Sequence, residues 1–130
     1  MLASFADDFA HPPGPYGEWR GGERDSRGVI QMPWVEYADW LDRFVRACSS
    51  GGWVRPDVDW PRWIQTPDAE RLRTDPEALA NASVRDLACL LTAIIRSDRF
   101  NEGSILGACE SGLIERITRR AAELRRIEAG

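Results

Sequence analysis

The segment "SVRDLACLLTAIIR" (Ser83–Arg96) decides the fold, because its apolar residues recur every three or four positions. This spacing places them on one face of an α-helix. Leu90 and Ala93 lie beside that face, so the predicted helix is apolar around most of its girth. Ser83 and Asp86 have the spacing of a capping box, which satisfies free backbone N–H groups at the start of a helix. We therefore predict a central helix around which the domain is built.

The next segment, "SDRFNEGSILGACESGLIERI" (Ser97–Ile117), holds three glycines and three glutamates. Asn101 is predicted to cap a short helix that begins at the next residue. Gly103 and Gly107 are four residues apart, on one face of that helix, where they allow another backbone or a small ligand to come close. Gly112 is predicted to bend the chain before the last helix. The segment lacks the spacing of a phosphate-binding loop, and no predicted strand precedes it.

Further helices are predicted on both sides of this central part. The segment "MPWVEYADWLDRFVRACSSGG" (residues 32–52) ends in two glycines and places six apolar residues on one helical face: Tyr37, Trp40, Leu41, Phe44, Val45 and Cys48. The segment "LIERITRRAAELRRIEAG" (residues 113–130) forms a basic last helix, whose dipole favours arginines near its C-terminus. Four prolines within residues 53–83 exclude one long helix and predict short turns, two of them starting at Pro67 and Pro76.

Residues 1–30 differ in composition from the rest of the chain. The segment "HPPGPYGEWRGGERDSRG" contains five glycines and three prolines in 18 residues, which cannot sustain a helix or a long strand. We expect residues 1–30 to form a flexible Gly/Pro-rich arm and residues 31–130 to form the helical domain. Four aromatic residues of the arm remain able to dock onto a partner or onto the domain: Phe5, Phe9, Tyr16 and Trp19.

These patterns together predict an all-α fold, a single compact helical domain of four or five helices with a flexible N-terminal arm. No segment has a sustained strand pattern, since the one β-like run, "GVIQMPWV", is interrupted by a proline. A chain of 130 residues is long enough to bury a core of its own.

Composition argues against several classes of partner. The net charge of −4 gives no overall attraction to nucleic acid or to an anionic membrane, so neither is expected as a partner. All 17 basic residues are arginines spread along the chain, which is typical of a GC-rich coding sequence. No apolar run reaches the roughly 18 residues of a membrane-spanning helix, and the N-terminus has no signal-peptide pattern. We expect a cytoplasmic protein.

The cysteines and the histidine favour a protein without a metal or cofactor. Cys48, Cys89 and Cys109 each lie in an apolar helical pattern, and no CxxC spacing is present, so buried, reduced thiols are expected. His11 is the only histidine and lies in the Pro/Gly-rich segment. A metal site or a histidine-based catalytic pair would depend on that single residue.

A family resemblance is carried by the motif R-F-x-E-G-x-(I/L)-x-x-A-x-E-S-G-(L/I)-I, which runs from Arg99 to Ile114 after "LLTAIIR". Together with "MPWVEY" and "DWPRW", the motif resembles the DUF6508 family of small uncharacterised bacterial proteins over about residues 32–127. Its strongest positions are Arg99, Phe100, Glu102, Gly103, Glu110, Ser111 and Gly112. The resemblance implies a bacterial origin and a compact domain, and it implies no established activity.

Two functional interpretations of this motif stay open. In the first, Glu102 and Glu110 pair with arginines of the neighbouring helix, such as Arg96 or Arg99, and the glycines permit close helix packing. The protein is then a protein–protein interaction or oligomerisation module, and a protein partner or self-association is expected. The aromatic N-terminal arm fits such a role.

The second interpretation is a small-molecule binding protein or an enzyme that uses a pocket near Arg99, Glu102 and Glu110. Arg99 would hold an anionic group, and Trp60 or Trp63 would stack on a ring, unless these tryptophans only cover an edge of the core. On a continuous helix the two glutamates lie about 12 Å apart along the axis, too far for one proton-transfer pair. The candidate ligand- or partner-binding residues are therefore Trp60, Trp63, Arg99, Glu102 and Glu110, and no catalytic residue is assigned.

Overall fold

Helices make up most of the computed structural model, which describes residues 2–24, 26–30 and 32–129 of the chain. Within these residues there are eight α-helices, one 3₁₀ turn (η1) and two strands. In chain order they are η1 (Leu2–Phe5), α1 (Ala6–Ala10), β1 (Gly17–Arg20), β2 (Trp34–Tyr37), α2 (Asp39–Ser50), α3 (Trp60–Trp63), α4 (Pro67–Thr74), α5 (Pro76–Ala80), α6 (Val84–Ser97), α7 (Ser104–Glu110) and α8 (Leu113–Ala129). The fold is mostly helical, but the prediction of four or five helices without strands is wrong.

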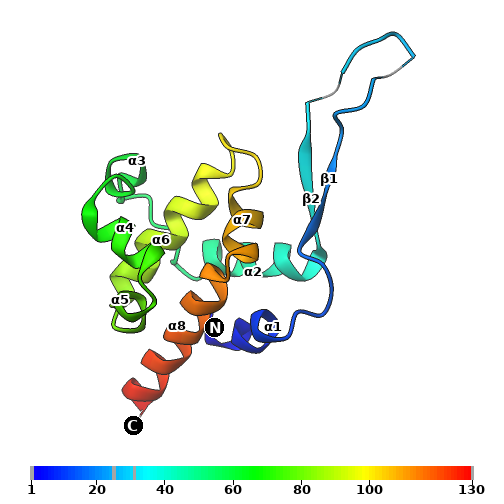
Figure 1. The fold of residues 1–130 in the computed structure, drawn as a ribbon. Coiled ribbons are helices and arrows are strands. Elements are labelled where there is room, and N and C mark those ends of the chain that lie inside the picture. The colour runs from blue at the N-terminus through cyan, green and yellow to red at the C-terminus, as the bar shows by residue number, and fades with distance from the viewer. Residues whose placement is uncertain (1, 25, 31, 130) are drawn as a thin grey trace.

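Helix α6 lies at the centre of the helical body, between the α3–α5 group and α7 (Figure 1). Every residue from Leu87 to Ile94 is buried. Both bonds of the predicted capping box form, since the Ser83 N–H donates to Asp86 Oδ2 and the Asp86 N–H donates to Ser83 Oγ, each at 3.1 Å. The predicted central helix is therefore confirmed.

The additional helices arise because prolines divide residues 53–83 into three short pieces. Thr66 caps α4 and Asp75 caps α5, each through a side-chain oxygen that accepts a backbone N–H, at 3.2 and 3.0 Å respectively. A proline follows each cap, and its fixed φ suits the first helical position. Both predicted proline-started helices are confirmed.

The two strands form a hairpin that the sequence analysis did not predict. They pair antiparallel, with Gly17 opposite Tyr37 and Arg20 opposite Trp34. Tyr37 therefore belongs to β2, and the helix predicted within residues 32–52 begins only after it. The strands are separated by a connection much longer than the two to five residues of a common hairpin loop, which conceals their pairing.

The η1 turn and helix α1 pack into the helical core against α8. Leu2 and Phe9 are each only 2% exposed. The ring centroid of Phe9 lies 4.8 Å from that of Phe44 and 5.3 Å from that of Trp40. The docking onto the domain that the sequence left open is therefore observed for Phe9, and η1 and α1 pack against the helical body. Flexibility of the rest of residues 1–30 stays a prediction.

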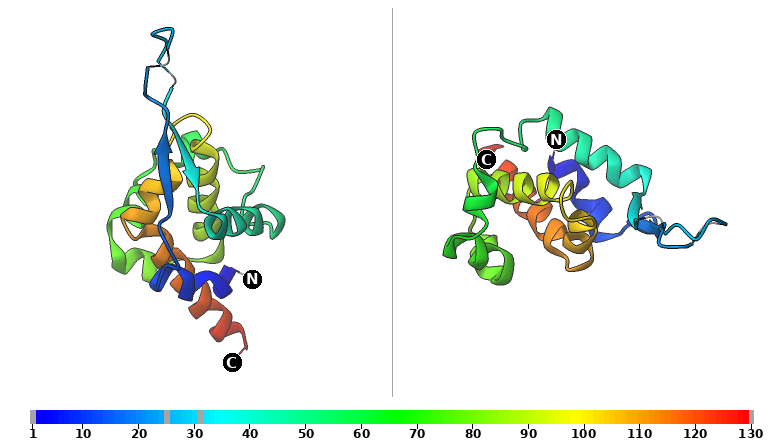
Figure 2. Two further views of the ribbon diagram at one scale, coloured as in Figure 1. Left: turned by 90° about the vertical axis from the view of Figure 1, so that its right-hand side faces the viewer. Right: turned by 90° about the horizontal axis from the view of Figure 1, so that it is seen from above.

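The hairpin projects from the helical body in every view (Figures 1 and 2). Its base lies beside α7, while the described residues of the connection between the strands lie farthest from the helices. The segment between α6 and α7, residues 98–103, therefore lies where the body meets the hairpin. We call this segment the connector.

The thiols give a first test of the core. Cys48, Cys89 and Cys109 are buried and free. Burial disfavours the charged thiolate and raises the pKa of Cys48 and of Cys109 to about 12. The folded protein should therefore react slowly with Ellman's reagent at pH 8, and all three thiols should react at once in denaturant.

The same shifts predict a loss of stability in alkali. An unfolded chain ionises its thiols near pH 9, whereas folded Cys48 and Cys109 stay neutral up to about pH 12. The stability from these groups is complete below pH 9 and falls as the pH rises toward 12. For the labelling experiment, rapid reaction of the native protein with Ellman's reagent at pH 8 would contradict the buried placement of the three thiols.

Candidate functional site

Asp98, the first residue of the connector, joins three elements. Its Oδ1 atom accepts two hydrogen bonds, one from the hydroxyl group of Tyr37 at 2.7 Å and one from the backbone N–H of Ile105 at 3.1 Å. The first bond ties β2 to the end of α6, and the second satisfies a free N–H in the first turn of α7. Burial, reinforced by the bond to Asp98, raises the pKa of Tyr37, so the hydroxyl stays protonated and continues to donate.

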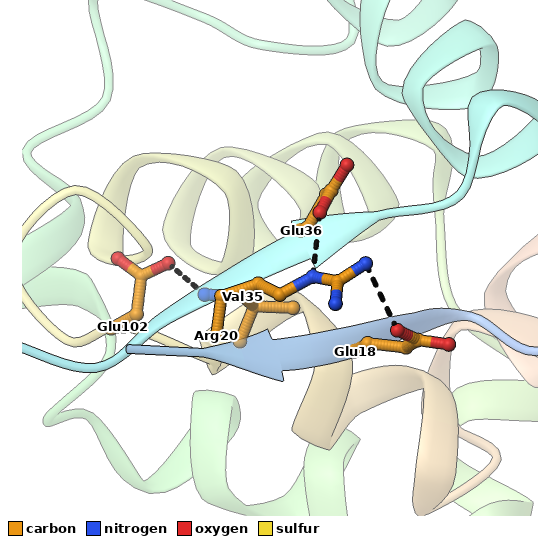
Figure 3. Close-up of polar contacts among 5 residues, drawn as sticks. All are labelled: Glu18, Arg20, Val35, Glu36 and Glu102. Carbon is orange, nitrogen blue, oxygen red and sulfur yellow. Dashed lines mark hydrogen bonds and ion pairs between the residues drawn. The ribbon is translucent and has the colours of Figure 1, made fainter. Parts of the chain in front are cut away.

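Glu102 holds the inner edge of the hairpin. Its Oε1 accepts the backbone N–H of Val35 at 2.7 Å, as Figure 3 shows. A carboxylate acceptor makes this a stronger bond than one between neutral groups. The predicted pairing of Glu102 with Arg96 or Arg99 does not occur in the part of the chain that the structure describes, because the carboxylate binds the strand instead.

Gly103 completes the contact between the connector and the hairpin. Its backbone conformation and its lack of a side chain both favour glycine at this position. Its φ angle is +95°, and a Cβ atom added there would lie 2.9 Å from the ring of Trp19. The residue is also the N-cap of α7, so the predicted cap at Asn101 is wrong. The helix starts two residues later than predicted because the connector first turns toward the hairpin.

Arg20 lies between two carboxylates on the opposite face of the hairpin. Its guanidinium binds Glu36 at 2.8 Å and Glu18 at 3.2 Å (Figure 3). The hydrogen bond to Glu36, followed by the attraction of both carboxylates, raises the pKa of Arg20. Glu18 and Glu36 are opposite each other in the ladder, so this face has two acidic groups for one basic group.

A separate groove of about 360 Å³ lies on the other side of α7 and reaches Trp60. A Cβ atom added to Gly107 would meet nothing within 4 Å, so this glycine faces open space. The Trp60 ring stacks on the exposed ring of Phe100, with centroids 6.4 Å apart. Arg73 is the only charged residue among the described residues that line the groove. The approach of another backbone, predicted at both glycines, is therefore not observed: the side chain of Trp19 lies at Gly103, and Gly107 faces open space.

The five predicted site residues are not brought together. Trp60 lines the groove, whereas Trp63 packs against the core and lines a different hollow, beside Asp59 and Arg85. Arg99 and Glu110 are exposed, and neither lines the groove. Glu102 faces the hairpin. These residues therefore do not form one site.

Sequence reasoning missed Val35, Tyr37 and Asp98 as contacts between the hairpin and the connector. For Trp19 it left docking onto the domain open. The signal was present in "GEWR" and "WVEY", where aromatic and β-branched residues favour strands. Each run is only four residues long, and the two are interrupted by residues 21–33, so neither stood out.

The sequence model of the DUF6508 family, described as a family of unknown function, matches residues 1–127 of the chain. The chain belongs to this family. The DUF6508 match includes η1, α1 and both strands, and so extends beyond the motif-based resemblance over about residues 32–127. Comparison with curated proteins and with solved structures gave no match.

Two absences apply to the described residues of this DUF6508 protein. Residues 2–24, 26–30 and 32–129 contain no cluster of three or more potential metal ligands. Over the same ranges, every helix is too short or too polar to cross a membrane.

The two glycines provide a matched pair of variants. Gly103→Ala should lower the free energy of unfolding by about 1–3 kcal/mol, because the added methyl group meets Trp19 and the backbone has a positive φ. Gly107→Ala should leave stability unchanged or raise it by up to about 1 kcal/mol, since alanine favours a helix. Urea denaturation measures both. Equal effects of the two substitutions would contradict the contact with Trp19.

A second matched pair tests the hold on β2. Glu102→Ala removes the acceptor for the Val35 N–H, so exchange of that amide with deuterium should quicken by about ten-fold, as expected for loss of a charged hydrogen bond. Glu110→Ala is the control, because Glu110 is exposed and has no ion pair among the described residues. If both variants speed exchange at Val35 alike, the bond is not what protects the strand.

Proposed function

We propose that this protein is a protein–protein interaction module whose contact surface is the hairpin. The observation that carries the proposal is the gathering of exposed, large apolar side chains on this one projection. Met32 is 84% exposed, and four others on the hairpin are at least 43% exposed: Trp19, Val29, Ile30 and Trp34. Several large apolar side chains left exposed on one projection commonly mark a contact site.

The base of the hairpin is held in a defined position, which supports a presenting role. Bonds from Asp98 to Tyr37 and from Glu102 to Val35 fix β2 against the connector. The packing of Trp19 over Gly103 adds a contact from β1. A surface that is fixed before binding loses less conformational entropy when a partner docks.

The ligand-binding alternative has less support from the geometry. A pocket near Arg99, Glu102 and Glu110 requires these side chains to converge, and they do not share the groove with Trp60. The groove itself offers one arginine and a half-exposed indole, which is a thin set of polar groups for a specific small-molecule site. The interaction surface on the hairpin is therefore the better-supported proposal.

The proposal predicts that a photo-crosslinking amino acid on the hairpin will capture a defined protein in the native host. The probe is placed at Met32 in one variant and at Trp19 in another, since both side chains are exposed. A discrete crosslinked product should appear for at least one position on gel electrophoresis. Its mass identifies the partner as a second copy or as another protein.

The control places the same probe at Ile127, which is exposed but lies near the end of α8, away from the hairpin. This variant should give no product of that mass. Absence of a product at both hairpin positions, with each variant folded by circular dichroism, would refute the contact surface.

A further inference from the structure

We infer that the partner of the hairpin is a second copy of this chain, joined through the outer edges of the two β1 strands as an antiparallel pair centred on Trp19. The inference rests on the proposed function and specifies the partner. It follows from the direction of the backbone groups of β1 and from the order of charges along the strand.

The outer edge of β1 has free backbone groups. The Val35 N–H points away from β1, because it donates to Glu102. In an antiparallel ladder this makes Trp19 and Val35 a non-hydrogen-bonded pair, so the N–H and C=O of Trp19 point outward as well. No other described element lies along this edge (Figures 1 and 2). An edge of this kind is a template for another strand.

The sequence of β1 and the residue after it is complementary to itself. Residues 17–21 read "GEWRG", with glutamate and arginine on either side of Trp19. A two-fold axis at Trp19 places Glu18 opposite Arg20 of the partner subunit and Gly17 opposite Gly21 of the partner subunit. Opposite charges directly across an antiparallel pair are stabilising. The same axis brings together the two outward-facing Trp19 backbones.

Neighbouring registers are disfavoured by the same charges. An axis at Glu18 would place this residue opposite the partner's Glu18, and an axis at Arg20 would place two arginines together. Like charges directly opposite each other destabilise a strand pair. Of these three two-fold registers, the charge order therefore selects the one centred on Trp19.

The pairing also adds a second basic neighbour to each Glu18. Glu18 and Glu36 share the single guanidinium of Arg20. In the pair, the partner's Arg20 supplies a second guanidinium on the other side of Glu18. The association also turns a two-stranded ribbon, which is marginally stable by itself, into a four-stranded sheet.

Charge-reversal variants test this register. Glu18→Arg should place two arginines opposite each other, and Arg20→Glu should place two glutamates together, so each variant alone should associate at least ten-fold more weakly than the unaltered chain. An equimolar mixture of the two should associate again, because the arginines of one chain meet the glutamates of the other. The double variant Glu18→Arg/Arg20→Glu should also regain association. Sedimentation velocity over a range of concentrations measures each case.

The substitutions are at exposed positions, and circular dichroism melts check that each variant is folded. Hydrogen exchange gives a second measurement, since protection of the Trp19 N–H should rise with protein concentration. Three results would each overturn the inference. The unaltered chain could be monomeric at all concentrations, or its dimer could be unaffected by the charge reversals. Hydrogen exchange at the Trp19 N–H could be independent of protein concentration. A crosslinked product containing a different protein, found with a monomeric chain, would overturn it while leaving the proposed function in place.

Discussion

The hold of the connector on β2 is the constraint on which the arrangement of the molecule depends. Asp98 binds Tyr37 and also the start of α7. Glu102, a few residues after Asp98, binds the backbone of Val35. A single short turn therefore fixes the end of α6, the beginning of α7 and the base of the hairpin. The helical body forms its own core, but the direction in which the hairpin projects is decided by these two carboxylates.

The parts of the fold that were predictable from sequence are those whose information lies within one or two helical turns. In the capping box of Ser83 with Asp86 and in the cap at Thr66, the hydrogen-bonded residues are three positions apart. Both features were predicted correctly. The hairpin was not, because Val35 and Tyr37 find their partners 67 and 61 residues away. Glu102 was selected as a candidate site residue, but its partner is a backbone N–H, which no pattern of side chains reveals.

The two edges of the hairpin are treated differently, and this limits what the hairpin can join. The N–H of Val35 on the edge of β2 is already bonded to Glu102, whereas no other described element lies along the edge of β1. Strands with two open edges can add further strands without end. With one edge bonded to its own body, the proposed pairing through β1 would end after a single addition and give a finite assembly.

The docking of η1 and α1 against α8 has a consequence for synthesis of the chain. The η1 turn and α1 leave the ribosome well before α8, the helix against which they pack. Until α8 emerges, Leu2 and Phe9 lack one of the surfaces that bury them in the folded protein. Closing so long a loop is slow compared with local helix formation. The nascent chain therefore carries these apolar side chains incompletely buried until α8 has emerged.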